Sequence, residues 1–118
     1  MITATLNPTE RDYEMLAEAL KHGSNETLDD VRLKVGTGFY VALKTPDSVV
    51  TIAQDGPALH ICQMTGKMED VPEILETVET IGKELGKEYI SLQGRKGWLR
   101  VLDKFGFKRH DNEMRLAI

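Results

Sequence analysis

His60 and Cys62 are the two residues whose types and spacing come nearest to a chemical site. They stand two positions apart in an apolar run, so in a strand both side chains would point to one face, as a pair of metal ligands would. The sequence holds no second pair with metal-ligand spacing, and His22 and His110 fall in predicted surface turns. A cysteine nucleophile needs a base and an exposed, electropositive setting, which this run does not offer. We therefore predict no metal site, and a core cysteine beside a hydrogen-bonded histidine.

Acidic side chains are concentrated where the longest predicted helix begins. They are Glu69, Asp70, Glu73, Glu76 and Glu79. Carboxylates near a helix N-terminus are stabilised by the helix dipole, so a solvated, well-capped helix face explains them. Two alternatives remain. In the first, this face docks a basic partner. In the second, one of these carboxylates, or Asp47 or Asp55 in the turns, acts as a general base toward an amine.

Basic side chains lie mainly in the last third of the chain. Residues 1–80 contain 6 Lys and Arg against 14 Asp and Glu, whereas residues 81–118 contain 9 against 5, and the whole chain has a net charge of -4. This acidic balance makes nucleic-acid binding an unfavoured function. A local basic face remains, formed by Arg95, Lys96, Arg100, Lys104, Lys108 and Arg109. We interpret it as a solvated surface, with a phosphate, a nucleic acid or an acidic protein as the alternative partner.

The length of 118 residues is that of one ordinary domain, so we predict a single domain over residues 1–118. With 41% hydrophobic and 29% charged residues, the composition is that of a soluble globular protein, and no apolar run approaches the roughly 20 residues of a membrane-spanning helix. The first residues lack the basic and apolar regions of a secretory signal. One cysteine cannot form an intrachain disulfide. These features favour a cytoplasmic protein that does not contact a membrane.

Apolar residues recur at helical spacing in four segments. The predicted helices cover residues 8–22, 24–36, 71–85 and 95–105. The first is capped by Asn7 or Thr9, and Glu10 stands three residues after Asn7, as in a capping box. The third has Asp70 as its cap and Pro72 in its first turn. The fourth is predicted to bury Trp98, Leu99, Leu102 and Phe105.

Runs rich in β-branched and aromatic residues predict the strands. They cover residues 2–6, 39–43, 48–53, 58–64, 89–92 and 107–118, the last as one strand or a broken pair. Turn-forming residues around Pro46 and Pro57 join the second, third and fourth strands into an antiparallel meander. The predicted fold class is α/β (α+β): a mixed sheet in which this meander is followed by strand-helix-strand-helix-strand, with three to four helices. Ligands would bind between the ends of the two parallel strands, 58–64 and 89–92.

The chain's last third carries a family resemblance. The segment Gly94-Arg95-Lys96-Gly97-Trp98 leads into a helix that ends at Gly106-Phe107. Together with the order of the elements, this segment resembles the GNAT acetyltransferase superfamily, and more narrowly it is similar to the short acetyltransferase-like proteins of tailed phages and prophages. The resemblance implies a GNAT-like fold over nearly the whole chain and acetyl-CoA or CoA as cofactor. A phage origin would imply a host cytoplasm or a virion as the location.

The resemblance also implies a cofactor loop. In GNAT enzymes a loop of Arg or Gln, x, x, Gly, x, Gly or Ala follows the fourth strand, and its backbone amides hold the pyrophosphate of acetyl-CoA at the start of the next helix. The cofactor-binding residues implied here are Met64, Thr65, Gly66, Lys67 and Arg95. The second glycine is absent, Glu69 and Asp70 would repel a pyrophosphate, and Pro72 removes one amide.

Leu102 stands where many GNAT enzymes have a tyrosine that protonates the leaving thiolate, and a leucine cannot donate a proton. No catalytic residue is therefore assigned. From this and the altered loop we expect a catalytically degenerate protein of phage or prophage type, which acts as a binding or virion-assembly accessory with an unknown protein partner or with itself. The alternative is a small acetyl-CoA-dependent N-acyltransferase with substrate-assisted or water-mediated proton transfer. A third interpretation is nucleic-acid binding through the C-terminal basic face.

Overall fold

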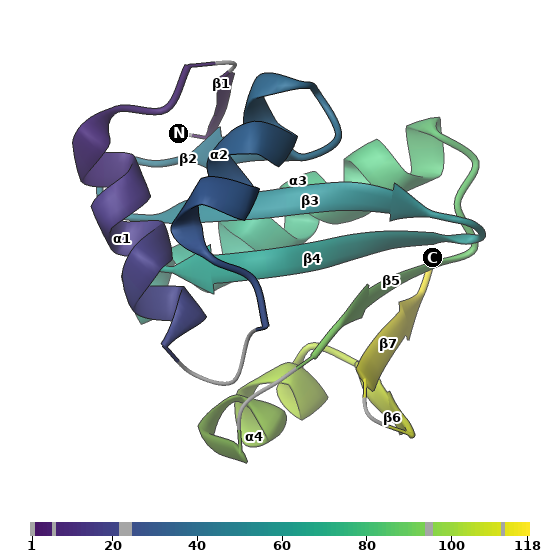
Figure 1. Ribbon diagram of the computed structural model, residues 1–118. Coiled ribbons are helices and arrows are strands. Elements are labelled where there is room, and N and C mark those ends of the chain that lie inside the picture. Colours follow the sequence, from purple (N-terminus) through teal and green to yellow (C-terminus); the bar gives the residue numbers. More distant parts are fainter. Residues whose placement is uncertain (1, 6, 22–24, 94–95, 112) are drawn as a thin grey trace.

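The computed structural model describes residues 2–5, 7–21, 25–93, 96–111 and 113–118, with the backbone alone for residues 96–99. The described residues form one seven-stranded mixed sheet in the order β1-β2-β3-β4-β5-β7-β6 (Figure 1). The strands are β1 Thr3–Thr5, β2 Val41–Lys44, β3 Val49–Asp55, β4 Ala58–Thr65, β5 Tyr89–Leu92, β6 Lys108–His110 and β7 Glu113–Ala117. Neighbours are antiparallel except β4 and β5, which are parallel. The predicted meander, the parallel pair and the broken final pair are confirmed.

Helices cover both faces of this sheet. They are α1 Glu10–Leu20, α2 Leu28–Gly36, α3 Val71–Glu84 and α4 Lys96–Lys104, and a 3-10 turn, η1 Met68–Asp70, precedes α3. Figure 1 shows α1 and α2 in front of β3 and β4, with α3 behind them. The mixed α/β fold class is therefore as predicted. Gly23, the predicted end of the first helix, and Arg95, the predicted start of the last, lie outside the described residues.

The first two helices begin with the same capping motif. Thr9 caps α1 and Thr27 caps α2, and each threonine forms a capping box with an aspartate three residues later. In the first box the Thr9 amide donates to Asp12 Oδ2 at 2.8 Å, and the Asp12 amide donates to Thr9 Oγ1 at 3.2 Å. The Thr9 alternative is confirmed, whereas the box of Asn7 with Glu10 is wrong, because Thr9 is the cap and Glu10 is the first residue of the helix instead of the third.

The start of α3 differs from the prediction in one respect. Pro72 lies in the first turn as expected, and Asp70 occupies the cap position, but the backbone of Asp70 is helical and its side chain makes no capping bond. The preceding turn η1 holds Asp70 in that conformation. Its carboxylate is therefore directed to partners outside the helix, as described below.

The described residues form two apolar clusters, one on each face of the sheet. The cluster on the α3 face includes Leu59, Ile61, Val78, Leu102 and Phe107, and the cluster on the other face joins α1 and α2 to Val49 and Ala53. Leu102 is fully buried as predicted. Phe105 is not: it is 37% exposed at the end of α4, where Phe107 takes the core position instead. The side chains of Trp98 and Leu99 lie outside the described residues.

The second predicted strand begins later than its apolar run. β2 starts at Val41, and Phe39 lies in the preceding turn with 61% of its surface exposed. Gly38 has φ of +81° at this turn, a conformation that favours glycine. Tyr40, rather than Phe39, is the aromatic residue that packs into the core.

Candidate functional site

The parallel strands β4 and β5 separate before β4 ends. Their pairing runs from Ala58 opposite Tyr89 to Ile61 opposite Leu92, where β5 stops, while β4 continues to Thr65. In Figure 1 the two strands diverge from this point, β4 toward α1 and β5 toward α4. Among the described residues, the edge of β4 that faces β5 therefore has no strand partner over its last residues.

A β-bulge lies where the strands separate. β3 and β4 pair as Thr51 opposite Gln63 and Ile52 opposite Ile61, which leaves Cys62 as the extra residue of β4. The Gln63 amide donates to Thr51 Oγ1 at 3.1 Å, toward β3. Because successive residues of a strand direct their amides to alternate edges, the backbone N–H and C=O of Met64 point toward the side that β5 has left. This edge can pair with an amide of a ligand.

The loop after β4 is tied to the turn between β2 and β3. The Lys67 amide donates to Ser48 Oγ at 3.0 Å, and the Ser48 hydroxyl donates to Asp70 Oδ2 at 2.5 Å. The Thr45 hydroxyl donates to the same oxygen at 2.8 Å. These hydrogen bonds, first that from Ser48 and then that from Thr45, hold the pKa of Asp70 below its ordinary value. The loop therefore has a fixed shape, and one of its amides is already occupied.

The structure brings four of the five predicted cofactor residues together. Met64, Thr65, Gly66 and Lys67 run consecutively from the free strand edge to the start of η1, while Arg95 lies outside the described residues. The Lys67 ammonium is mostly exposed and lies 3.3 Å from Asp47 Oδ2. Whether these residues bind CoA stays a prediction.

His60 faces the other side of the sheet from Ile61. Its Nδ1 lies 2.7 Å from Ser91 Oγ, the side chain of the residue opposite it on β5. Burial lowers the pKa of His60, although Glu113 and Asp55 oppose the shift, so the imidazole is neutral at pH 7. The prediction of a hydrogen-bonded histidine is confirmed, and a neutral imidazole at this position is able to accept a proton.

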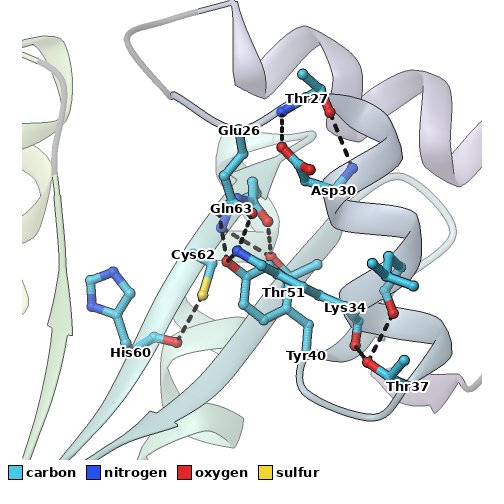
Figure 2. Close-up of polar contacts among 11 residues, drawn as sticks. Glu26, Thr27, Asp30, Lys34, Thr37, Tyr40, Thr51, His60, Cys62 and Gln63 are labelled. Atoms are coloured by element: carbon cyan, nitrogen blue, oxygen red, sulfur yellow. Dashed lines mark hydrogen bonds and ion pairs between the residues drawn. The ribbon is translucent and has the colours of Figure 1, made fainter.

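A polar cluster on the α2 side of the bulge was missed by the sequence analysis. Figure 2 shows Glu26 at its centre. The Tyr40 hydroxyl donates to Glu26 Oε1 at 2.6 Å, Lys34 Nζ donates to Oε2 at 2.8 Å, and Gln63 Nε2 donates to Oε1 at 3.3 Å. Burial raises the pKa of Glu26, but the hydrogen bonds from Lys34 and Tyr40 outweigh it, so the net pKa lies below the ordinary value. Only Gln63 had a signal: it stands three residues before Gly66, as the Arg or Gln of the GNAT loop does.

Cys62 is half-buried and packs against the core cluster of α1 and α2. Burial raises the pKa of its thiol to about 12. The thiol is therefore not activated, in agreement with the predicted core role. The described residues contain no group of three or more His, Cys, Asp or Glu that could hold a metal ion, and none of the described helices is long and apolar enough to cross a membrane.

The remaining charged candidates are dispersed. Glu73 and Glu76 line an open, shallow depression on the outer face of α3 with Thr77, Thr80 and Ile81. Lys108 and Arg109 are exposed but are neighbours on one strand, so they point to opposite faces of the sheet. The predicted basic face is thus divided. Asp55 ends β3, and its charge acts on the pKa of His60, whereas Asp47 is half-exposed beside Lys67 in the turn between β2 and β3.

Comparison with solved structures shows that this fold is the fold of the GNAT acetyltransferases. A Bacillus subtilis acetyltransferase in complex with CoA gives a TM-score of 0.75 at 12% identity, covering 99% of this chain and 97% of that one. An IAA acetyltransferase from Bacillus cereus gives 0.72 at 8% identity, covering 100% of both chains. The PaiA N-acetyltransferase from Thermoplasma acidophilum in complex with coenzyme A gives 0.63 at 12% identity, covering 98% and 96%. No family model and no curated protein matches the sequence.

Proposed function

We propose that this protein is an acyl-CoA-dependent N-acyltransferase, and that the free edge of β4 binds the cofactor. The observation that carries the proposal is the separation of β4 from β5 at Ile61 and Leu92, in a fold shared with acetyltransferases, two of them in complex with CoA. The expectation of a degenerate accessory protein is supported less well, because the comparisons give acetyltransferases and no accessory protein.

The residues at this edge fit the arm of CoA. That arm contains amide groups, and the backbone N–H and C=O of Met64 can pair with an amide as a neighbouring strand would. The start of η1 and α3 lies directly after the loop, where backbone amides and the helix dipole favour an anion, and Lys67 adds a positive charge there. Bound acetyl-CoA would supply an acyl thioester, whose carbon–sulfur bond breaks as the acceptor nitrogen bonds to the acyl carbon and the CoA thiol leaves.

His60 is the residue we propose to accept the acceptor's proton. An alkylammonium must lose a proton before its nitrogen can attack a carbonyl carbon. When the imidazole hydrogen is on Nδ1, it is donated to Ser91 Oγ, and Nε2 is then free to accept that proton. Leu102 is buried in the core and takes no part in this transfer.

Thermal unfolding with and without acetyl-CoA tests the proposal. Ligand at 100 times its dissociation constant adds about 2.7 kcal/mol, which corresponds to a rise of about 10 °C in Tm for a domain of this size. Met64→Pro removes the free N–H at the strand edge, and Met64→Leu is the matched control that keeps it. We expect acetyl-CoA to raise the Tm of the wild type and of Met64→Leu, but not of Met64→Pro. No shift of the wild type at millimolar acetyl-CoA would contradict the proposed function.

A binding protein that keeps the fold without catalysis is the second candidate. Two observations favour it: the Lys67 amide is occupied by Ser48, and the position of the family's tyrosine is a buried leucine. This candidate predicts no acetyl-CoA-dependent acylation of any amine, and its phage or prophage origin stays a prediction.

A further inference from the structure

On the sheet face that carries His60, one row of side chains crosses four strands. His60 of β4 is opposite Ser91 of β5, Ser91 is opposite Arg115 of β7, and Arg115 is opposite Lys108 of β6. Directly opposite residues of neighbouring strands point to the same face. In Figure 1 α1 and α2 cover β3 and β4 on this side, whereas none of the described helices is drawn across β5, β7 and β6. Figure 2 shows the His60 ring pointing away from the Glu26 cluster, toward these strands.

Arg115 is held in place but keeps part of its binding capacity. Its Nε donates to Glu113 Oε2 at 2.6 Å, and its guanidinium carbon lies 4.6 Å from the centre of the Tyr89 ring. Within the described part of the chain its two terminal nitrogens make no hydrogen bond, and the side chain is 37% exposed. A fixed guanidinium whose two terminal nitrogens keep their N–H groups free can bind a carboxylate or a phosphate through two hydrogen bonds.

The charges around Arg115 also favour an anion. Lys108 is directly opposite Arg115, and two like charges in that arrangement destabilise a sheet. Glu113 forms an ion pair with Arg115 and the charge of Asp111 also acts on Arg115, whereas Lys108 makes no ion pair among the described residues. An anion bound between Arg115 and Lys108 would relieve this repulsion. The other end of the row, at His60, is neutral at pH 7.

We propose that the acceptor is an amine that also carries an anionic group, a carboxylate or a phosphate. The amine lies at His60 and the anionic group at Arg115 and Lys108. His60 and Arg115 are two strand spacings apart, about 10 Å between Cα atoms, so several bonds separate the two groups of the acceptor. The place of the amine rests on the proposed acyltransferase function, whereas the anion site at Arg115 does not.

The test is the binding of matched small molecules by isothermal titration calorimetry, which needs no turnover. The probes are 4-aminobutyrate and butylamine, which differ in the carboxylate, and phosphoethanolamine as the phosphate-bearing amine. We expect 4-aminobutyrate or phosphoethanolamine to bind at least about 10-fold more tightly than butylamine, and the tighter of the two identifies the anionic group. Arg115→Gln should remove this preference. Arg115→Lys keeps the positive charge but not the paired N–H groups of the guanidinium, so it should reduce the preference. Arg109→Gln is the matched control, because Arg109 is on the opposite face of β6, and it should bind like the wild type.

The proposal would be overturned if butylamine bound as tightly as the anionic amines, or if no probe bound measurably. It would also be overturned if the preference survived in Arg115→Gln. The acetyl-CoA unfolding experiment on the same preparation separates the two inferences. A preference that depends on Arg115 without an acetyl-CoA shift supports the anion site and contradicts the acyltransferase. An acetyl-CoA shift without the preference supports the acyltransferase and contradicts the anionic acceptor.

Discussion

Gly66 lies so close to Ser48 that position 66 has no room for a side chain. A Cβ built there would overlap the Ser48 Oγ and the carbonyl oxygen of Asp47, and Gly66 has φ of +129°. The resemblance to GNAT enzymes implies that this glycine allows a phosphate to approach. In the structure it allows the turn between β2 and β3 to approach, so it is required for folding whether or not a phosphate binds.

Gly66→Ala should therefore destabilise the protein without any ligand. Strain at a positive φ and overpacking against Ser48 together cost about 3 kcal/mol, which corresponds to a fall of about 10 °C or more in Tm. Thermal unfolding of the apoprotein measures it. Gly36→Ala is the control, because a Cβ at position 36 meets nothing within 4 Å, and its Tm should not fall. An unchanged Tm for Gly66→Ala would contradict the close packing of Gly66 against Ser48.

Asp70→Asn should tighten the binding of CoA about twofold. The substitution removes one negative charge beside the start of α3, and the asparagine oxygen can still accept from Ser48 and Thr45. Because the side chain lies near solvent, the gain is small and should shrink as salt is added. Calorimetric titration at two ionic strengths measures it, with Glu76→Gln, further along α3, as the control for charge alone. Equal or weaker binding by Asp70→Asn would show that its carboxylate does not act on the cofactor site.

Tyr40→Phe should lower the free energy of unfolding by about 1 to 2 kcal/mol. The Tyr40 ring is buried, and its hydroxyl donates at 2.6 Å to Glu26, a charged acceptor that would lose this bond. Urea denaturation measures the change. The neighbouring Phe39 is 61% exposed, so Phe39→Leu should change the stability by less than about 0.5 kcal/mol. If both variants unfold alike, the Glu26 cluster does not stabilise the fold.

Because of His60, both the free energy of unfolding and the catalytic activity should fall in mild acid. Its pKa is lower in the folded than in the unfolded chain, so its contribution is complete above the unfolded pKa of 6.5 and is lost as pH falls through the folded pKa. Urea unfolding at pH 7.5, 6.5 and 5.5 should show this loss in the wild type and in the exposed control His110→Gln, but less of it in His60→Gln. Under the proposed function, kcat/KM should fall over the same pH range, because a protonated His60 cannot accept a proton.

Cys62 should react slowly with iodoacetamide in the native protein. With a pKa of about 12 instead of 9.0, the thiol has about 1000-fold less thiolate at pH 8. The higher intrinsic reactivity of a more basic thiolate recovers part of this, so alkylation should be about 30- to 100-fold slower than in urea. A native rate equal to the rate in urea would mean that the thiol is activated, and Cys62 would again be a candidate nucleophile.

The elements of this fold were predictable because each has a local signal. The Tyr13, Leu16 and Leu20 spacing marks α1, and Pro46 and Pro57 mark the turns of the meander. Errors arose where tertiary packing decides. Phe105 fits the apolar face of its helix as well as Leu102 does, but the helix ends there and Phe107 fills the core.

The site was less predictable, because its geometry depends on pairs that are distant in sequence. The bulge at Cys62 follows from the register of β3 against β4, which periodicity does not reveal. Asp70 was expected to cap α3, yet its partners Ser48 and Thr45 come from a turn more than 20 residues earlier. Glu26 likewise reaches Gln63 across 37 residues, and no spacing rule connects them.

Both outer strands of the sheet are three residues long: β1, Thr3–Thr5, and β6, Lys108–His110. A foreign strand that added to either would find only three residues of backbone to pair with, and at β6 it would meet two cations. Long, flat, apolar edges are what seed the stacking of sheets into aggregates, and short or charged edges prevent it. Copies of this protein are thereby hindered from polymerising by extending one another's sheets, even when the solution is concentrated.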